Sequence, residues 1–177
     1  MKKTIIGLAL VAGLAAGPVL AANAKLEAPA HQFIDAFNKG DLKGAAAANA
    51  PGGISIIDEV PPHYWTGAGA FSAWAADLAT DAKAHGDTDG KVTLGAVQRS
   101  EMTGDHGYVV MAATYTYNEK GVAMREPARF VFAMVRGAGG WKIAAWTWAG
   151  GKPAPAPAAK AAPAVKPAPA AAPATKK

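Results

Sequence analysis

Cysteine is absent from this chain of 177 residues. Its absence excludes disulfide bonds, thiolate metal sites and a cysteine nucleophile. The sequence also has no H-x-H or H-E-x-x-H metal motif, no G-x-S-x-G nucleophile motif and no G-x-G-x-x-G dinucleotide motif. We therefore expect no metal site and no cofactor, and a fold that is stabilised by its hydrophobic core alone.

Positive charge is also scarce where a nucleic-acid-binding domain would need it. Residues 25–151 carry 11 Lys and Arg against 13 Asp and Glu, whereas residues 152–177 carry five Lys and no acidic residue. The net charge of +5 therefore comes from the two ends of the chain. A domain that binds nucleic acid concentrates basic residues on its folded body, so we expect no nucleic-acid partner.

The first 24 residues have the pattern of a secretory signal peptide. Lys2 and Lys3 precede an apolar run, and small residues then fit cleavage after Ala21 or Ala24. A transmembrane anchor is the alternative, but the run is rich in Gly and is broken by Pro18. We expect a bacterial protein that is periplasmic or secreted.

The last segment, residues 151–177, consists mostly of Pro and Ala, with Lys at intervals. It has no periodic apolar face, so we expect a disordered, partly extended tail. One interpretation is a spacer whose Lys residues make weak, salt-sensitive contact with an anionic cell envelope. The other is a solubilising tail without a partner.

The body between these segments, residues 25–150, has the length of one domain with a hydrophobic core. Its periodicity predicts helices over residues 25–40, 42–50 and 70–86 and a first strand over residues 54–60. We expect four further strands over residues 91–102, 106–118, 126–137 and 141–150, with Asp87–Gly90 as a turn before them.

The short connections between the last four strands favour antiparallel pairing. The order of elements predicts an α+β fold, in which a curved antiparallel sheet carries three helices on one face.

This order resembles the nuclear-transport-factor-2-like superfamily, in particular its SnoaL-like bacterial members. The resemblance covers residues 26–149 and rests on three motifs: HQFIDAFNKGDLKG, the Trp-Thr-Gly before the third helix, and the GGWKI that opens the last strand. It implies a cone-like half-barrel whose three helices close a pocket. Known members include isomerases, dehydratases, cyclases, epoxide hydrolases, small-ligand binders and assembly modules, so the fold implies a pocket and not a reaction.

Enzymes of this superfamily, as the resemblance implies, usually place an acid–base carboxylate in the pocket. The candidates here are Asp58 and Glu59, at the end of the first expected strand. Adjacent strand residues point to opposite faces, so we expect only one of them to enter the pocket, and we favour Asp58 as the base. The alternative is that both carboxylates are solvated at the strand end.

The residues after Pro61 and Pro62 are candidates for the pocket mouth, because the two prolines stiffen the backbone that presents them. His63 is either a proton-transfer partner or a surface residue. Tyr64 and Trp65 are ligand-binding candidates, with a core position as the alternative for Trp65.

Strand alternation supplies the remaining candidates. Tyr115 and Tyr117 share one strand face and line either the pocket or the outer sheet, and Tyr115 is a candidate catalytic partner. Arg129 lies among apolar residues, so it should pair with Asp58 or Glu126 or bind an anionic ligand.

The tryptophans of the last expected strand form the final candidate group. Trp146 and Trp148 should form an aromatic platform for a ligand, opposite Trp141 and Ile143, or pack against a second subunit.

Three functions remain open from the sequence. The first is binding of a small apolar or aromatic molecule without turnover. The second is a proton-transfer or hydrolytic enzyme with Asp58 as base, Tyr115 or His63 as its partner and Arg129 orienting the substrate. The third is a homodimeric assembly module that its tail tethers to the envelope.

Overall fold

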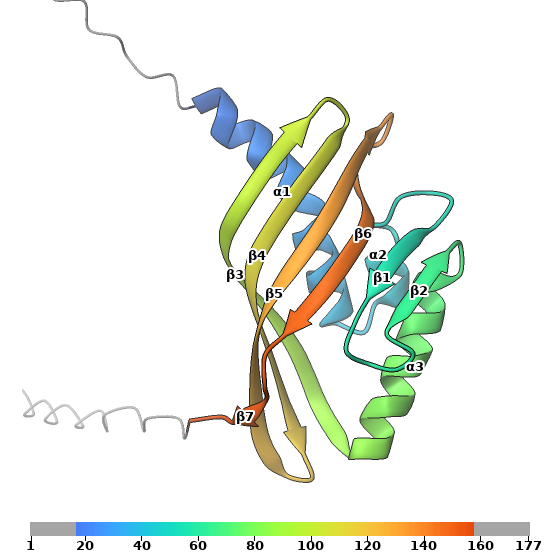
Figure 1. Cartoon of the computed structure of the whole chain (residues 1–177), viewed down its shortest axis with the longest axis vertical. Coiled ribbons are helices and arrows are strands. Elements are labelled where there is room, and N and C mark those ends of the chain that lie inside the picture. The colour runs from blue at the N-terminus through green and yellow to red at the C-terminus, as the bar shows by residue number, and fades with distance from the viewer. Residues whose placement is uncertain (1–16, 158–177) are drawn as a thin grey trace, which may run out of the picture.

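The structure, a computed structural model, describes residues 17–157 (Figure 1). The helices and strands in this part of the chain follow the expected order of two helices, a strand, a helix and a meander, with two additional short strands, β2 and β7. Their bounds are α1 Gly17–Phe37, α2 Leu42–Ala46, β1 Ile54–Ile57, β2 Tyr64–Gly67, α3 Ala70–His85, β3 Asp87–Thr103, β4 His106–Glu119, β5 Val122–Gly137, β6 Gly140–Gly150 and β7 Ala154–Pro155.

The strands form a single curved sheet in the order β2-β1-β6-β5-β4-β3, and β7 pairs with β5. The expected α+β fold is confirmed, but the sheet is mixed because β1 pairs with β6 in parallel. A hairpin enforces antiparallel pairing only between strands that are joined by a short turn. The chain between β1 and β6 contains α3 and four strands, so β6 is free to run in the same direction as β1.

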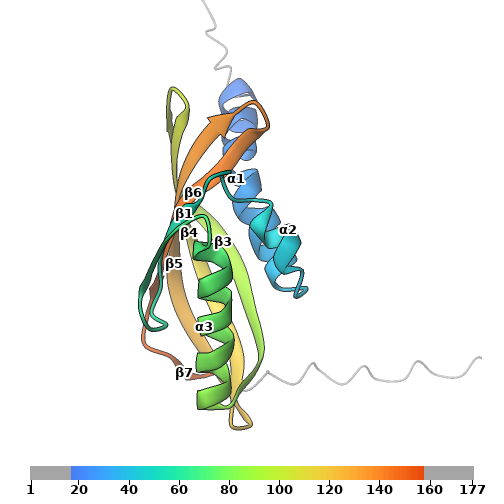
Figure 2. The ribbon, with the colours of Figure 1, turned by 90° about the vertical axis from the view of Figure 1, so that its right-hand side faces the viewer.

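All three helices lie on one face of the sheet, as Figure 2 shows. The apolar residues at helical spacing face the core. Leu26, Phe33 and Ile34 of α1 and Trp74 of α3 are almost fully buried. Phe33 is the centre of this core, with its ring centroid 5.8 Å from that of Trp146 and 6.1 Å from that of Phe130. The helices therefore cover an aromatic stripe on β5 and β6.

Both ends of the folded body differ from the expected boundaries. Helix α1 begins at Gly17 and so continues through the expected cleavage positions, while most of the expected signal peptide lies outside the described residues. At the other end, Ala154 and Pro155 form β7 against Met124 and Arg125, so the tail does not begin at residue 151. The rest of the expected tail lies outside the described residues. Within residues 17–157, no helix combines the length and the apolar character needed to cross a membrane.

Two short segments were assigned wrongly from the sequence. Asp87–Gly90, expected to be a turn, belongs to β3, where Asp89 has a φ of 58° and the register with β4 shifts between Thr88 and Lys91. The segment after the two prolines, expected to be a connection, contains β2, which pairs antiparallel with β1.

Candidate active site

The two adjacent carboxylates that follow β1 both reach the pocket. Strand β1 ends at Ile57, and the backbone N–H of Asp58 donates to the carbonyl of His63 at 3.2 Å, inside the loop that follows. Strand alternation therefore no longer applies at Asp58 and Glu59, and both line the same cavity. The expectation that only one of them could face the pocket was wrong, because it extended the strand three residues too far.

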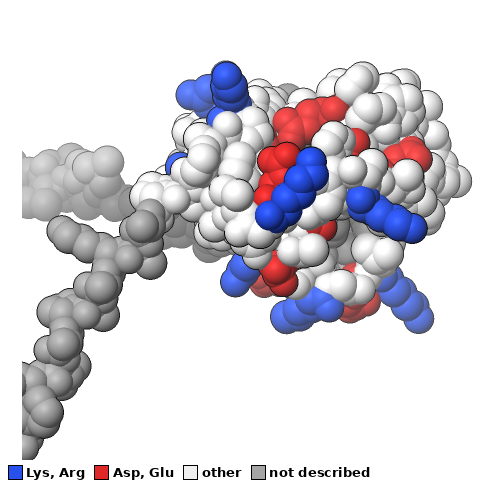
Figure 3. Space-filling view, turned by 90° about the horizontal axis from the view of Figure 1, so that it is seen from below, with Lys and Arg blue, Asp and Glu red and all other residues white. Residues whose placement is uncertain are grey.

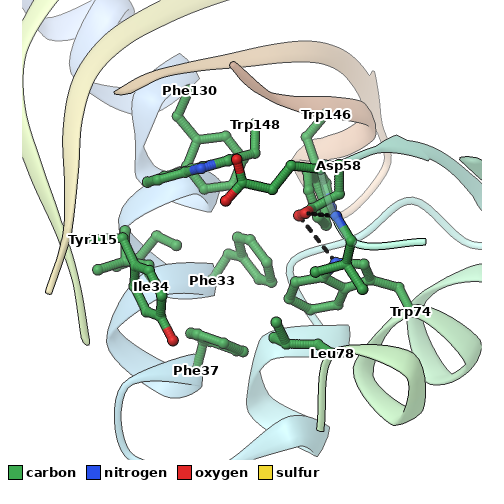
Figure 4. A pocket seen from close by; sticks show the side chains of 13 residues that line it. Phe33, Ile34, Phe37, Asp58, Trp74, Leu78, Tyr115, Phe130, Trp146 and Trp148 are labelled. Atoms are coloured by element: carbon green, nitrogen blue, oxygen red, sulfur yellow. Dashed lines mark hydrogen bonds between the residues drawn. The ribbon is translucent and has the colours of Figure 1, made fainter. Parts of the chain in front are cut away.

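The Asp58 carboxylate is held on both of its oxygens (Figure 4). Oδ2 accepts a hydrogen bond from Trp74 Nε1 at 3.1 Å, and Oδ1 accepts one from the backbone N–H of Val60 at 3.1 Å. Burial raises the pKa of Asp58, and these two hydrogen bonds oppose part of that rise because they stabilise the charged form. The result is a fixed carboxylate in an apolar wall.

This wall surrounds a small cavity of about 60 Å³, which we call the inner pocket. Aromatic rings from α1, α3, β4, β5 and β6 dominate its lining, as Figure 4 shows. The residues that line it are Phe33, Ile34, Phe37, Asp58, Glu59, Val60, Trp74, Leu78, Val92, Tyr115, Phe130, Trp146 and Trp148.

A second carboxylate pair lies beside the inner pocket. Glu126 on β5 is only 1% exposed, and its Oε1 accepts a hydrogen bond from Trp148 Nε1 at 2.9 Å. The carboxylates of Glu59 and Glu126 both occupy the space beside Gly150 that a side chain at this position would fill. Burial and the neighbouring Glu126 carboxylate raise the pKa of Glu59 to about 8, and burial also raises the pKa of Glu126. The pair therefore retains a proton at neutral pH.

A wider cavity of about 410 Å³, which we call the outer cleft, lies next to the inner pocket. Glu59, Val60, Leu78 and Tyr115 line both spaces. The outer cleft is acidic, and its charged and polar lining consists of Glu59, Asp81, His85, Asp87, Tyr115, Tyr117, Glu119 and Glu126.

The view from below shows acidic side chains near the middle of this end of the molecule, with Lys and Arg around them (Figure 3). Within residues 17–157, no Lys or Arg lines either cavity. His85 is the basic side chain in the lining of the outer cleft, and it pairs with Asp81, so a ligand in these cavities would face mainly acidic side chains.

Strand β6 places Trp146 and Trp148 on one face, as expected, but Ile143 lies on that face as well. Its register with β5 shifts between Ala133 and Met134, so that an extra residue of β6 is accommodated there. Such a bulge reverses the alternation of side chains, and Ile143 is therefore buried on the same face as Trp146 and Trp148, not on the opposite face as expected. Both tryptophans form part of the inner pocket wall.

The two tyrosines of β4 lie side by side on the helix-covered face. Their rings are stacked with centroids 5.0 Å apart. Tyr115 lines both cavities, and burial raises its pKa to about 12, whereas Tyr117 lines only the outer cleft. Tyr115 is also the cross-strand partner of Glu126 on β5, but its hydroxyl lies on the other side, against Gly90 of β3.

Four of the expected site residues lie elsewhere. His63 and Tyr64 are exposed at the start of β2 and line neither cavity. Trp65 is buried in the core and donates its indole N–H to Asp77 at 2.8 Å. Arg129 is exposed on the other face of β5 and donates to Gln98 at 3.0 Å, so the expected pairing with Asp58 or Glu126 does not form.

Sequence reasoning missed Glu126 and Trp74 as site residues. Glu126 shares its strand face with Phe130 and Phe132, and a carboxylate on an apolar face that alternates in this way was the available sign of a buried acid. Trp74 carried no comparable sign, because its hydrogen bond depends on where the loop after β1 turns. Within the described residues, no group of three or more His, Cys, Asp or Glu side chains is arranged to hold a metal ion.

Comparisons with known proteins agree with this architecture. The family model described as "SnoaL-like domain" matches residues 26–147. Comparison with curated proteins gave no match.

Among solved structures, a ketosteroid isomerase-like protein from Erwinia carotovora atroseptica superposes with a TM-score of 0.55 at 20% identity, covering 72% of this chain and 95% of that one. The hexachlorocyclohexane dehydrochlorinase LinA-type3 from Novosphingobium barchaimii gives 0.66 at 13% identity, covering 82% and 97%. A putative scytalone dehydratase from Novosphingobium aromaticivorans gives 0.61 at 10% identity, covering 84% and 97%. At these identities the structural neighbours show the fold alone.

Proposed function

The chain belongs to the SnoaL-like domain family, and on that premise we propose that it is an enzyme that moves a proton on a small molecule whose reacting end enters the inner pocket. The reaction class is isomerisation or elimination with Asp58 as the general base. This proposal takes the enzyme alternative from the sequence and replaces His63 and Arg129, which lie outside the pocket, with Trp74 and the Glu59–Glu126 pair.

One observation carries the proposal: the Asp58 carboxylate is fixed in the wall of an aromatic pocket. A base works best when its pKa lies near the working pH, and burial moves the pKa of Asp58 in that direction. The hydrogen bonds from Trp74 and Val60 hold the carboxylate in one orientation while it waits for a proton. Carboxylates without a cationic partner in an apolar site are costly to fold, which favours a functional reason for their presence.

The Glu59–Glu126 pair supplies the complementary acid. Asp58 would remove a proton from carbon, and the electron pair would move toward an electron-withdrawing group of the substrate. In an isomerisation a carboxyl that still carries its proton would protonate the substrate at a second carbon. The pKa of about 8 keeps a proton on this pair at neutral pH.

The structural neighbours support the reaction class only by analogy. Their names describe isomerisation, dehydrochlorination and dehydration. Each of these reactions begins or ends with proton transfer at a small molecule, and the same fold carries all three.

A small ketone tests the proposal directly. Cyclohex-3-en-1-one isomerises to the conjugated cyclohex-2-en-1-one when a base removes the proton between the carbonyl and the double bond, and the conjugated product is followed by its ultraviolet absorption. We expect the purified protein to accelerate this conversion, and Asp58→Asn to reduce the acceleration by about a hundredfold or more.

The matched control is Asp105→Asn, which removes an exposed carboxylate that pairs with Arg136. It should leave the rate unchanged. No acceleration by the wild-type protein, or an equal loss in both variants, would contradict the proposal.

Binding without turnover is the second candidate, and the apolar, aromatic lining of the inner pocket favours it. It predicts that cyclohexenone binds equally well to wild-type protein and to Asp58→Asn, with no conversion by either. Titration calorimetry together with the absorption assay separates the two functions.

Export, dimerisation and envelope contact are also proposals. Tyr108 is an exposed aromatic side chain on the face of β4 opposite the helices, and that open sheet face supplies a surface for a homodimer. Sedimentation at high concentration tests the dimer, and the N-terminal mass of protein from a bacterial periplasm tests cleavage after Ala21 or Ala24. Deletion of residues 152–177 should abolish any envelope association.

A further inference from the structure

The indole N–H of Trp146 is a buried hydrogen-bond donor without an acceptor. Trp146 is 2% exposed, and its Nε1 has no hydrogen-bond partner among the described residues. A donor that leaves water without gaining an acceptor destabilises the folded state, so native proteins rarely keep one without a reason. Trp146 lines the inner pocket, so a ligand that enters this pocket is a candidate for the missing acceptor.

The other buried tryptophans show that this fold normally satisfies its indoles. Trp65 donates to Asp77 at 2.8 Å, Trp74 donates to Asp58 at 3.1 Å and Trp148 donates to Glu126 at 2.9 Å. Trp146 sits among them, with its ring packed edge-on against Trp74 at a centroid distance of 4.9 Å. It is therefore the exception within a cluster of paired indoles.

We propose that Trp146 is the polar recognition residue of the inner pocket and that it donates to a neutral oxygen of the ligand, such as a carbonyl or hydroxyl oxygen. This inference rests on the proposed function, because it names the substrate class of the same site. Trp146 pairs with Ile56 across the parallel β1–β6 ladder, two residues before Asp58. Trp146 and Asp58 line the same small cavity, so a ligand oxygen held by Trp146 would lie near the base.

The acidic side chains around the pocket favour a ligand whose oxygen is neutral. Asp58 and Glu59 line the inner pocket, Glu126 lies next to it, and no Lys or Arg within the described residues lines either cavity. A carboxylate or phosphate ligand would be repelled by these groups. A ketone, aldehyde or alcohol offers the same lone pair without the charge.

The volumes decide how much of the ligand enters. An apolar cavity of about 150 Å³ holds benzene. The inner pocket, at about 60 Å³, is therefore too small for a whole ring and accepts only the oxygen-bearing end of a molecule. The rest of the ligand would lie in the outer cleft of about 410 Å³, against Tyr115 and Leu78.

This placement also gives Trp146 a part in the reaction. When Asp58 removes a proton next to a carbonyl group, negative charge develops on the carbonyl oxygen. A preorganised N–H that points at that oxygen binds the charged form more strongly than the neutral ketone and so lowers the barrier.

Indole resonances of the intact protein test the inference. Protein labelled with ¹⁵N at tryptophan is titrated with cyclohexanone, with methylenecyclohexane, which has the same shape but no oxygen, and with cyclohexanecarboxylate. The Nε1–H signals are assigned from single Trp→Phe variants. We expect cyclohexanone to move the Trp146 signal downfield, methylenecyclohexane to move it much less, and the carboxylate at neutral pH to leave it in place.

Affinity provides the second measurement. Trp146→Phe keeps an aromatic ring and removes the donor, so cyclohexanone should bind about two- to tenfold more weakly, while methylenecyclohexane should be unaffected. Trp65→Phe is the matched control, because it removes a buried indole N–H outside both cavities, and it should change neither affinity. The wild-type titration stands even if Trp146→Phe does not fold.

The opposing outcomes are equally definite. The inference is wrong if the Trp146 signal responds equally to cyclohexanone and to methylenecyclohexane. It is also wrong if, with cyclohexanone bound, the Trp146 Nε1–H still shows a cross-peak to a bound water, because the water would then be its acceptor. Ketone binding through Trp146 without any isomerase activity would refute the proposed reaction and leave this inference intact. Isomerase activity that is the same in wild type and Trp146→Phe would refute this inference and leave the proposed reaction intact.

Discussion

The carboxylates of Glu59 and Glu126 converge on the empty side of Gly150. A Cβ on Gly150 would contact Glu126 Oε1 and would lie 2.6 Å from Glu59 Oε2. The end of β6 must therefore be a glycine for the loop after β1 and strand β5 to bring their carboxylates together. This relationship brings three distant parts of the chain together at a carboxylate pair whose pKa values are raised.

Gly150→Ala should destabilise the protein by about 1–3 kcal/mol, because the added methyl group overpacks the space that both carboxylates occupy. Urea unfolding measures the change. Gly139→Ala is the matched control, since a Cβ there meets no atom within 4 Å, and it should shift stability by less than about 0.5 kcal/mol. Equal stability of the two variants would show that the carboxylates do not meet at Gly150.

The carboxylate pair should make the protein less stable as the pH rises from about 5 to above 8. Its pKa values in the folded state are raised above the ordinary value for glutamate, to about 8 for Glu59. The folded state then binds more protons than the unfolded state across this window, so the stabilisation is complete at low pH and is lost as the pH passes the folded pKa.

Unfolding in urea at pH 5 and pH 8.5 measures this dependence. Glu59→Gln should reduce the difference between the two pH values, because a neutral amide replaces one titrating group of the pair. Glu27→Gln, on α1, should leave the difference unchanged. The same pH dependence in wild type and Glu59→Gln would mean that the Glu59–Glu126 pair does not take up a proton on folding.

Much of the fold was predictable because it depends on the spacing of apolar residues. The helical spacing of Leu26, Phe33 and Ile34 and the alternation of Phe130 and Phe132 require only a count along the chain, and all five residues are buried as that count requires. Periodicity also correctly placed Trp146 and Trp148 on one face.

The site was less predictable, because it depends on where periodicity stops. Nothing in the sequence marks the end of β1 at Ile57, which allows both Asp58 and Glu59 to turn inward. The bulge in β6 and the meeting of Glu59 with Glu126 are products of tertiary register. Such features follow from which strands become neighbours, and the parallel β1–β6 contact is not encoded by any local turn.

Trp74→Phe should move the working pH of the proposed base upward. The hydrogen bond from Trp74 Nε1 lowers the pKa of Asp58, so its removal should raise that pKa further. The acid limb of the kcat/KM profile for cyclohex-3-en-1-one should shift to higher pH, while the alkaline limb stays in place.

Trp65→Phe is the control for that shift, because its indole donates to Asp77 instead. It should leave the acid limb where it is in the wild type. An unchanged acid limb in Trp74→Phe would mean that Asp58 does not titrate in the reaction.

Gly90 and Tyr115 should be energetically coupled across the β3–β4 ladder. A Cβ on Gly90 would contact the Tyr115 hydroxyl and lie 3.1 Å from two carbons of its ring. Gly90→Ala should therefore push Tyr115 away from the wall of both cavities and destabilise the protein by about 1–3 kcal/mol. Tyr115→Phe removes the hydroxyl and with it the closest contact, so the double variant should lose less stability than the sum of the two single variants. Urea unfolding of the four proteins should give a coupling energy of at least about 0.5 kcal/mol.

The same cycle with Tyr108→Phe, on the opposite face of β4, is the control and should be additive. Additivity in the Tyr115 cycle as well would mean that the phenol does not fill the space beside Gly90.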